Sequence, residues 1–290
     1  MNSPWLLLDV SYLAYRAYYA IGGKLSHNDI GTSVIYGILK ELFSLQEIFH
    51  TKRVAWCFDH GKPKRCALLP QYKGTRHENK TDEEKEIVNE IRNQIERMRV
   101  DYLPSLGFRN VLFEKGFEAD DIIAALIKLR PARSFVIVSN DQDLYQLLRE
   151  GVVIWKPTAK EVYTEDHLAE EYGIQPLDWI DVKAYAGCDS DNVPGIDGVA
   201  NKTAAKWLRG EITKGKIFDK FKANDALLKA NRKLVTLPFP GISDIRLKKD
   251  NTSADKWLAL IDRLGMNSLA SYIPGIPRRS SIKLKRNTLR

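Results

Sequence analysis

The chain of 290 residues is poor in the side chains that form disulfides and soft-metal sites, with three cysteines and five histidines. Cys57, Cys66 and Cys188 have neither the spacing of a zinc site nor that of a disulfide framework. This usage favours a reducing, intracellular and therefore cytoplasmic location, with Cys57 in the core. No pairing of Ser or Cys with His stands out, so no protein nucleophile is indicated.

Long apolar runs are also absent from the sequence. No run approaches the roughly 20 residues that a membrane span needs, and residues 1–4 lack the basic and apolar regions of a signal peptide. Hydrophobic residues still make up 44% of the chain and charged residues 28%, as in an ordinary soluble protein with a large core. We therefore expect one or two globular domains and no membrane partner.

Acidic residues are fewer than basic ones: the chain has 37 Asp and Glu against 45 Lys and Arg, which gives a net charge of +8. This excess favours a polyanionic partner, with nucleic acid first, although a charge that serves only solubility explains it equally well. Residues 278–290 contain six basic residues and no acid. That composition predicts a disordered basic tail that adds affinity for phosphates.

The acids that are present gather where apolar, strand-like runs end. A single acid in such a place is usually a helix cap, because Asp and Glu accept hydrogen bonds from free N–H groups. Capping needs one acid per helix, however, and two of these clusters supply more. The acids are Asp9, Asp59, Glu118, Asp120, Asp121, Asp141 and Asp143, after the runs 5–8, 54–58, 110–113 and 135–138.

This arrangement predicts a metal site. In an open α/β sheet, side chains just past the carboxyl ends of neighbouring strands point into one crevice. Several carboxylates in one crevice repel each other unless cations neutralise them. Oxygen ligands without His or Cys favour Mg²⁺ or Mn²⁺. A further acidic loop at residues 187–192 is placed to complete the site.

Strand-like and helical segments alternate from residue 5 to about residue 155, which predicts an α/β fold with a mostly parallel sheet flanked by helices. The first long helix is expected at 32–50 and a mobile basic loop at 59–81. Thr81 and Glu84 then have capping-box spacing. The helix that follows carries an apolar stripe typical of core packing, made of Ile87, Ile91, Ile95, Met98 and Tyr102.

Beyond residue 156 the pattern is mostly helical, with helices expected at 164–172 and 176–186. A tight turn rich in Gly and Pro follows, and then a helix with Lys near its start. Such a helix N-terminus binds phosphate, and the pair of helices would hold a duplex by its backbone alone. An ordinary helical hairpin explains the segment equally well. The residues expected to contact nucleic acid are Gly195, Gly198, Lys202 and Thr203.

Taken in order, four motifs resemble those of the 5′ nucleases, the family of phage flap endonucleases, 5′–3′ exonucleases and the 5′ nuclease domain of bacterial DNA polymerase I. The resemblance covers residues 5 to about 273, nearly the whole chain. Each motif alone is a modest signal, but their order and separation are specific. They are Tyr72-Lys73-Gly74-Thr75-Arg76, Glu118-Ala119-Asp120-Asp121, Asp141-Gln142-Asp143-Leu144-Tyr145-Gln146-Leu147-Leu148 and Ser190-Asp191-Asn192-Val193-Pro194-Gly195.

The resemblance implies a fold and a division of the chain. Residues 1–160 would form a PIN-like nuclease core, with a helical arch over the active site at about 60–105. Residues 161–277 would form a helical helix-three-turn-helix region that binds DNA. Residues 278–290 would be the basic tail.

The resemblance also implies roles for individual residues. Lys73 and Arg76 match cations that grip the scissile phosphate, with Arg16 near it, while Tyr72 matches a stacking aromatic and Arg65 joins it among the DNA contacts. The first metal would be held by Asp9, Asp59, Glu118, Asp120 and Asp121, and the second by Asp141, Asp143 and Asp191.

Two residues depart from the family pattern. Cys188 occupies a position where Asp is usual, and Asp189, one residue later, can replace it as a metal ligand only if the loop shifts. Ala200 stands where Gly is usual in the turn. Because Ala tolerates positive φ poorly, a K⁺ site at the helix-three-turn-helix is in question.

The implied activity is that of a structure-specific 5′ nuclease in DNA replication and repair, acting as exonuclease and flap endonuclease. Water would attack the phosphodiester with help from two divalent ions. The partner would be DNA with 5′ flaps or ends, bound by a monomer in a bacterial or phage-infected cell, and any polymerase or single-strand-binding protein would be a separate chain. The alternatives are RNase H-like removal of RNA primers from RNA–DNA hybrids and a noncatalytic junction-binding protein.

Overall fold

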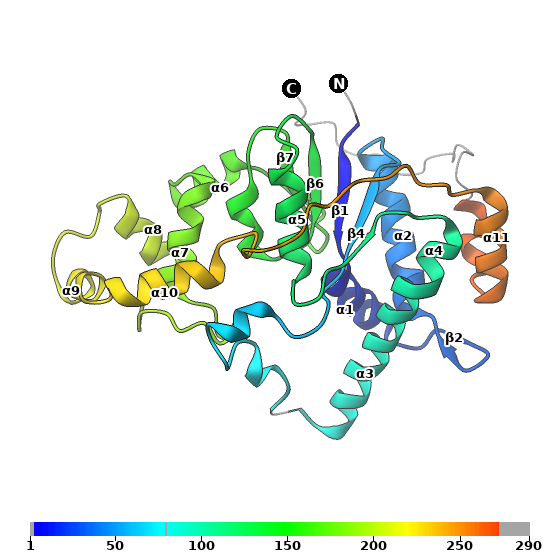
Figure 1. The fold of residues 1–290 in the computed structure, drawn as a ribbon, viewed down its shortest axis with the longest axis horizontal. Coiled ribbons are helices and arrows are strands. Elements are labelled where there is room, and N and C mark those ends of the chain that lie inside the picture. Colours follow the sequence, from blue (N-terminus) through cyan, green and yellow to red (C-terminus); the bar gives the residue numbers. More distant parts are fainter. Residues whose placement is uncertain (1–2, 79, 273–290) are drawn as a thin grey trace.

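The computed structural model describes residues 3–78 and 80–272. A six-stranded sheet runs through its centre (Figure 1). Its strands are β1 (Trp5–Asp9), β4 (Val54–Cys57), β5 (Val111–Leu112), β6 (Phe135–Val138), β7 (Val152–Lys156) and β8 (Glu161–Tyr163), in the order β5-β4-β1-β6-β7-β8. Only the pair β7 and β8 is antiparallel within this sheet of the described residues. The predicted α/β fold with a mostly parallel sheet is confirmed.

The central strands are buried on both faces, which explains why they read as continuous apolar runs. Alternate residues of β1 enter two separate cores: Leu6 and Leu8 one, Leu7 the other. Helices α1 (Val10–Ile21) and α2 (Ser33–Ile48) cover the first face, and α5 (Ala119–Lys128) covers the second. A small hairpin, β2 (Ser26–His27) and β3 (Ile30–Gly31), connects α1 to α2.

The segment expected as an arch projects below the carboxyl ends of the central strands in Figure 1. The expected capping box is present, because Thr81 accepts from the Glu84 N–H and Glu84 accepts from the Thr81 N–H. The apolar stripe packs into the first core, as predicted. The segment contains η1 (Lys64–Ala67), η2 (Gly74–His77), α3 (Asp82–Arg97), a π-helical turn Met98–Tyr102 and α4 (Leu103–Leu106).

A helical region lies at one end of the molecule, on the left in Figure 1. The helix expected at 176–186 is divided into a 3₁₀ turn and an α-helix, while the one expected at 164–172 is present. The elements are η4 (Gln142–Leu147), α6 (Glu165–Tyr172), η5 (Pro176–Asp178), α7 (Trp179–Ala186), η6 (Asp189–Asp191), α8 (Asn201–Leu208), α9 (Lys216–Ala223) and α10 (Asp225–Val235).

The chain then returns to the sheet. A strap, residues 236–253, has no helix or strand and leads to α11 (Ala254–Arg263) and η7 (Asn267–Tyr272). Trp257 of α11 packs edge-on against Phe43 of α2, with ring centroids 4.9 Å apart. The expected boundary at 160/161 therefore falls inside the β7–β8 hairpin, and α11 belongs to the core rather than to the helical region. The basic tail lies outside the described residues.

No helix in the described part of the chain has the length and apolar character that crossing a bilayer requires.

Candidate active site

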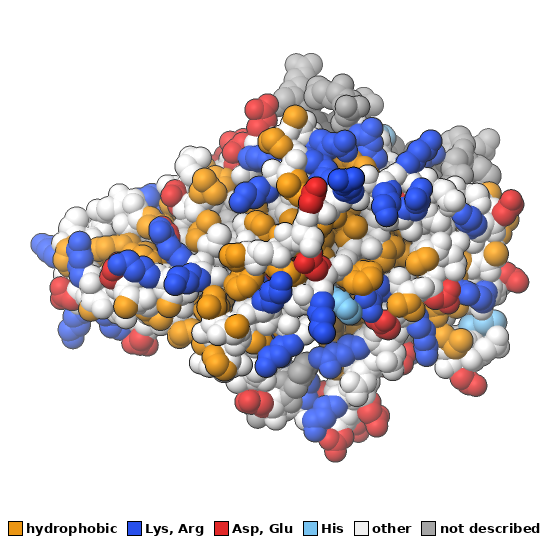
Figure 2. All heavy atoms as spheres, in the orientation of Figure 1, with side chains coloured by type: hydrophobic (Ala, Val, Ile, Leu, Met, Phe, Trp, Pro, Cys, Tyr) orange, Lys and Arg blue, Asp and Glu red, His pale blue; other side chains and the backbone are white. Residues whose placement is uncertain are grey.

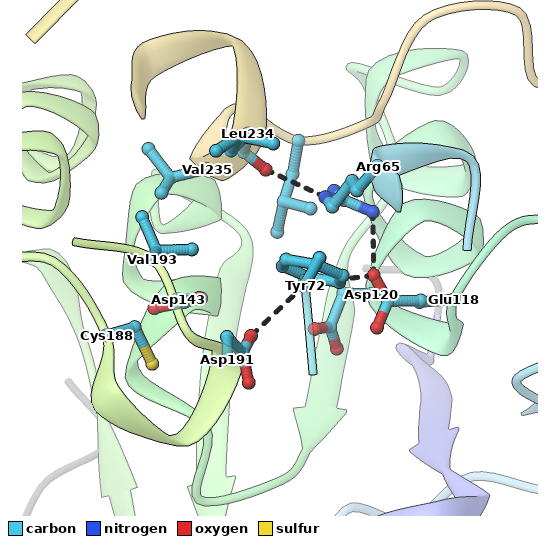
Figure 3. A pocket seen from close by; sticks show the side chains of 11 residues that line it. Arg65, Tyr72, Glu118, Asp120, Asp143, Cys188, Asp191, Val193, Leu234 and Val235 are labelled. Atoms are coloured by element: carbon cyan, nitrogen blue, oxygen red, sulfur yellow. Dashed lines mark hydrogen bonds and ion pairs between the residues drawn. The ribbon is translucent and has the colours of Figure 1, made fainter. Parts of the chain in front are cut away.

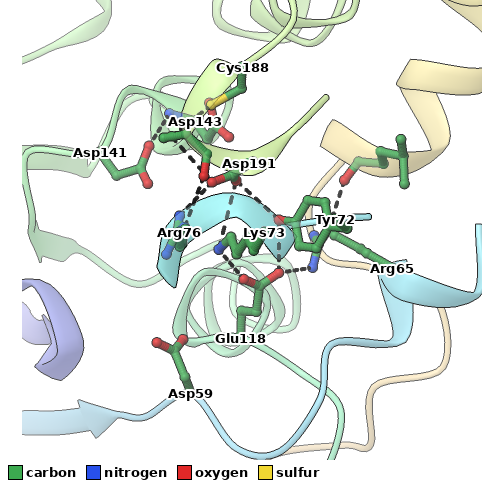
Figure 4. A network of polar contacts seen from close by, with 12 residues as sticks. Asp59, Arg65, Tyr72, Lys73, Arg76, Glu118, Asp141, Asp143, Cys188 and Asp191 are labelled. Carbon is green, nitrogen blue, oxygen red and sulfur yellow. Dashed lines mark hydrogen bonds and ion pairs between the residues drawn. The ribbon is translucent and has the colours of Figure 1, made fainter. Parts of the chain in front are cut away.

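Neighbouring strands deliver acidic side chains to one edge of the sheet. Asp9 is the last residue of β1, and Asp59 and Asp141 follow the two strands that flank it, β4 and β6. Glu118 and Asp120 join them from the start of α5, which is tied to this edge by a hydrogen bond from the Ala119 N–H to Asp59 at 2.8 Å. The predicted convergence of acids at the carboxyl ends of the strands is therefore present in the structure, and Figure 4 shows Asp59, Glu118 and Asp141 among them.

Asp9 is held in place by two donors. Its carboxylate accepts from the Tyr12 N–H at 3.0 Å, capping α1, and from the Ser139 hydroxyl at 2.9 Å. Ser139 is fully buried and also accepts from the Asp141 N–H at 3.1 Å, so it links two of the acids. Burial and the charge of Asp59 nevertheless raise the Asp9 pKa to about 7.

Two further carboxylates have raised pKa values although a lysine lies near each of them. Burial and the charge of Asp143 raise the Asp141 pKa to about 6. Burial, followed by the charges of Asp141 and Asp9, raises the Asp120 pKa well above its ordinary value. These acids resist ionisation because they face each other, which is the electrostatic condition that a bound cation relieves.

The arch contributes cations to the other side of the same site. The Lys73 ammonium pairs with Glu118 and lies 3.7 Å from Asp191, and the Arg76 guanidinium pairs with Asp191. The Tyr72 hydroxyl donates to Glu118 at 3.1 Å and to Asp191 at 3.2 Å. Glu118 of α5 and Asp191 of η6 are thereby bridged by the arch (Figure 4).

The backbone holds these arch residues against η6. The Lys73 N–H donates to the Asp191 carbonyl at 3.0 Å, and Thr75 donates twice to the Asn192 side chain. Lys73 has φ of 56°, a left-handed conformation that costs a non-glycine residue on the order of 1 kcal/mol. The stretch expected to be a mobile loop is therefore hydrogen-bonded to the helical region in this structure.

The ion pairs shift the pKa values of Asp191 and Lys73 so that the charged form of each is favoured. Burial alone would raise the Asp191 pKa, but Lys73 and Arg76 outweigh it and lower that pKa. Burial alone would lower the Lys73 pKa, but Glu118 and Asp191 raise it. Asp191 and Lys73 are both charged at neutral pH as a result.

The donor set suits hard divalent cations, since every carboxylate here offers oxygen. In the described residues no three His, Cys, Asp or Glu side chains are drawn together around one point as they stand. Lys73 and Arg76 lie between Glu118 and Asp191 instead. The raised pKa values of Asp9 and Asp141 still mark unneutralised negative charge on the sheet side, so the residues fit a cation there.

A sequence model of the family described as 5′–3′ exonuclease, N-terminal resolvase-like domain, matches residues 4–173, more than half of the chain. The chain belongs to the 5′–3′ exonuclease family. We therefore place it among the hydrolytic nucleases, as the resemblance of its motifs to the 5′ nucleases implied.

The chain is similar in sequence to bacterial DNA polymerase I. That of Mycobacterium bovis is 32% identical over 252 residues, 80% of this chain and 27% of the relative. That of Streptococcus pneumoniae is 37% identical over 214 residues, 70% of this chain and 23% of the relative. The chain thus spans about a quarter of the length of these relatives.

Solved structures share the fold. The T5 5′-exonuclease with bound zinc has a TM-score of 0.70 at 23% identity, covering 82% of this chain and 90% of that one. The T5 D15 flap endonuclease, in a pseudo-enzyme–product complex with DNA and metal ions, has a TM-score of 0.68 at 22% identity and covers 81% and 89%. The catalytic core of Rad2 with DNA has a TM-score of 0.58 at 15% identity and covers 96% and 93%.

Two residues expected at the surface or at a metal are placed elsewhere in this exonuclease-family chain. Arg65, expected to contact DNA, is only 3% exposed and donates to both oxygens of Asp121, at 2.7 and 2.8 Å. Asp121 is fully buried and also accepts from the Phe239 N–H at 2.7 Å. This pair therefore ties the arch and the strap to α5, and neither side chain is available to a ligand.

Tyr72 and Arg16 also differ from their expected positions. Tyr72 is 7% exposed, so its ring is not open to a stacking base while its hydroxyl binds Glu118 and Asp191. Arg16 donates to the Pro157 carbonyl at 3.1 Å and pairs with Glu41 at 3.4 Å. Arg16 thus lies beside the β7–β8 hairpin and pairs with none of the clustered acids.

The acidic loop is arranged with the cysteine inward. Cys188 lines a small pocket together with Asp143 and Asp191, whereas Asp189 is exposed (Figure 3). The Cys188 thiol lies 3.2 Å from the Ser190 hydroxyl, and burial raises its pKa. The loop therefore does not shift to bring Asp189 into the site.

We expect Asp189→Asn to leave the Mg²⁺ dependence of cleavage unchanged, because Asp189 is exposed and outside the pocket. Cys188→Asp, which adds a carboxylate beside Asp143 and Asp191, should keep cleavage and lower the Mg²⁺ concentration that gives half the maximal rate. Titrating Mg²⁺ against single-turnover rate for both variants tests this. Loss of cleavage in Asp189→Asn alone would reverse the assignment.

The turn before α8 packs closely against α7 and leads into the first turn of α8. A Cβ on Gly195 would lie 2.0 Å from the Ala186 carbonyl, so only glycine lets the turn approach α7. Gly198 has φ of 78°, whereas Ala200 has φ of −95°, an ordinary value for any residue. The departure at Ala200 therefore causes no strain. Lys202 is exposed and Thr203 half-buried in the first turn of α8.

Lys183 is a site residue that the sequence reasoning missed. It is 8% exposed, and its ammonium lies 2.9 Å from Asp143. Its signal was present in the sequence: spacing along α7 puts Lys183 on the same face as Trp179 and Ala186, where a lysine needs a buried acid.

The pKa of Asp9 predicts how stability depends on pH. In EDTA, stability should fall as the pH rises from about 4 to about 7, because folded Asp9 holds a proton that the unfolded chain has released. The expected loss is of the order of a few kcal/mol. Urea unfolding at pH 5.5 and pH 8 measures it.

Asp9→Asn should flatten part of this dependence, because Asn caps α1 equally well and cannot ionise. The matched control is Asp255→Asn, which neutralises an exposed acid of α11 and should keep the wild-type profile. Mg²⁺ should restore stability to the wild type at pH 8. Identical pH profiles for Asp9→Asn and wild type would contradict the prediction.

Proposed function

We propose that the chain is a divalent-metal-dependent, structure-specific 5′ nuclease that hydrolyses phosphodiesters in DNA with 5′ ends or single-stranded 5′ flaps, in replication and repair. One observation carries the proposal. Three adjacent strands bring Asp9, Asp59 and Asp141 to one edge of the sheet, and the arch places Lys73 and Arg76 on Glu118 and Asp191 beside that edge. That combination provides for both the cations and the phosphate that phosphodiester hydrolysis needs.

The carboxylates divide into two groups around the edge of the sheet. Asp9, Asp59, Glu118 and Asp120 would hold one Mg²⁺ or Mn²⁺ ion, and Asp141, Asp143 and Asp191 the other. When bound, such a pair supplies hydroxide near neutral pH and stabilises the leaving oxygen. Asp121 is left out of the first group because Arg65 occupies both of its oxygens.

The arch residues would change partners when DNA binds. Lys73 and Arg76 now neutralise Glu118 and Asp191, and a phosphate in the site would compete for the same two cations. A phosphate held this way places their positive charge where negative charge develops during hydrolysis. Release of the Tyr72 hydroxyl from Glu118 and Asp191 would free its ring to stack on a terminal base.

The helical region would hold duplex DNA through its backbone. Free N–H groups at the start of α8, together with exposed Lys202, suit a phosphate. Gly195 lets the preceding turn pack closely on α7, and Gly198 provides its positive φ. We extend the proposal to a K⁺ ion bound by carbonyls of this turn. A monomer would act on DNA or on RNA–DNA hybrids, and a polymerase or a single-strand-binding protein would act together with it.

The test is cleavage of a DNA bearing a labelled single-stranded 5′ flap, with Mg²⁺ or with EDTA. We expect products released from the 5′ end in Mg²⁺ only, and slower cleavage of the same sequence as a blunt duplex. A hybrid with an RNA 5′ segment compares the two nucleic acids. Binding of flap DNA without hydrolysis in Mg²⁺ or Mn²⁺ would favour the noncatalytic alternative.

A further inference from the structure

An exposed aromatic ring, that of Phe113, lies where the chain enters and leaves the arch, a surface that we call the outer foot of the arch. Phe113, between β5 and the acids of α5, is 46% exposed. The Arg99 guanidinium lies 4.3 Å from its ring centroid, and the His60 ring meets it edge-on at 5.2 Å. Arg99 is fixed in turn by Glu96, to which it donates from two nitrogens. The ring is therefore oriented by its neighbours although much of it faces solvent.

Three lysines lie on two paired stretches where the limbs of the arch meet, and one of these stretches adjoins this ring in the sequence. The Gly116 N–H donates to the His60 carbonyl at 2.7 Å and the Lys64 N–H to the Gly116 carbonyl at 2.9 Å, so the limbs are paired. Lys62, Lys64 and Lys115 are exposed on these paired stretches. Figure 2 shows Lys and Arg side chains gathered on this face.

These lysines are not neutralised by protein carboxylates. Within residues 3–78 and 80–272, none of Lys62, Lys64 and Lys115 pairs with an acid. The nearby acids have other partners, since Glu96 binds Arg99 and Glu114 binds Ser243. The Lys64 ammonium instead lies 4.0 Å from the Phe117 ring centroid. The foot thus combines an open aromatic ring with three lysines that form no ion pair among the residues that the structure describes.

We propose that this outer foot, made of His60, Lys62, Lys64, Arg99, Phe113 and Lys115, is a second nucleic-acid contact that binds single strands. A base stacks on the exposed side of Phe113, and lysines receive the adjoining phosphates. Aromatic rings beside cations bind single strands in this way with little sequence preference, because every base has a π face. Arg99 behind the ring strengthens the stack through its charge.

The location connects this surface to the candidate active site. His60 follows Asp59 directly, and Lys115 lies three residues before Glu118, so the foot adjoins two of the clustered acids in the sequence. A single strand that extends from a phosphate in the site therefore has an aromatic and cationic surface next to it. The inference deepens the proposed function and rests on a nucleic-acid substrate.

Phe113→Leu tests the stack, with Phe113→Tyr as the matched control that keeps the ring. Affinity for a labelled oligo(dT) is measured by fluorescence anisotropy in EDTA, so that no cleavage interferes. Because one stacked base contributes about 1–3 kcal/mol, we expect the Kd of Phe113→Leu to rise about 5- to 150-fold. Phe113→Tyr should bind like wild type, and the Kd for blunt duplex should change less than about twofold in both variants.

Neutralising Lys62 and Lys115 to Gln should lower the slope of log affinity against log salt by about 0.7 for each phosphate that a lysine no longer neutralises. An unchanged oligo(dT) Kd in Phe113→Leu, or equal weakening for oligo(dT) and duplex, would overturn the proposal. Flap cleavage in Mg²⁺ is assayed separately. A chain that binds oligo(dT) through Phe113 but cuts no flap would overturn the proposed function and leave the second nucleic-acid contact standing.

Discussion

We expect Asp120→Asn to reduce cleavage of a 5′-flap DNA by more than about a thousandfold, a loss of several kcal/mol of transition-state stabilisation. Among the described residues, no donor binds the Asp120 carboxylate, and burial with Asp141 and Asp9 nearby raises its pKa. A carboxylate in that environment is suited to a cation. Asp141→Asn should behave in the same way, since burial and Asp143 raise the Asp141 pKa too.

Binding should survive these substitutions. Neither substitution removes a cation or adds a negative charge, so the Kd for flap DNA in EDTA should stay the same or decrease. Single-turnover cleavage in Mg²⁺ and anisotropy in EDTA measure the two quantities. A variant that loses DNA binding but retains the wild-type single-turnover rate would refute the role.

The adjacent acid provides a contrast. Asp121→Asn should lower the free energy of unfolding, because buried Arg65 loses its bidentate partner and keeps only Glu118, whereas Asp120→Asn should not. Urea unfolding separates the neighbours. Equal losses of stability at Asp120 and Asp121 would show that both acids serve the fold.

We expect Lys73→Ala to slow cleavage about a hundred- to a thousandfold, the scale for losing one preorganised charge contact with the transition state. The Lys73 N–H donates to the Asp191 carbonyl, and Lys73 has the left-handed φ of 56°. Both features hold the residue in one position. Its contribution to ground-state affinity should be small, so the Kd for flap DNA should change less than about threefold.

The matched control is Lys85→Ala, which removes an exposed ammonium from the arch helix α3 and should cleave at the wild-type rate. Single-turnover rates at saturating enzyme separate chemistry from binding. If Lys73→Ala cleaves like Lys85→Ala, the ion pairs of Lys73 serve only the folded structure.

Local signals in the sequence predicted what depends on local physics. Asp9, Asp59 and Asp141 follow buried strands, and parallel pairing of those strands brings them together. The capping box at Thr81 needs only residues within four positions. These features follow from apolar periodicity and from the meeting of strand ends at one sheet edge.

Features that depend on a distant partner were not predictable in this way. Arg65 stood in a basic loop and was expected at the surface, but its buried partner Asp121 lies far along the sequence. Tyr72 was expected to stack, and its hydroxyl instead joins α5 to η6. The inward orientation of Cys188 depends on how η6 is packed, which no spacing encodes.

The return of α11 to the sheet has a consequence for how the molecule assembles. Trp257 and Leu269 pack into the same core as α2. The first face of the sheet is therefore not fully covered until the helical region, which lies between α2 and α11 in the sequence, has been synthesised. Contacts between such distant residues incur a loop-closure cost before they stabilise anything, which slows folding. While it is still attached to the ribosome, a chain lacking α11 would expose the apolar face of α2, where a chaperone or an aggregate would first engage it.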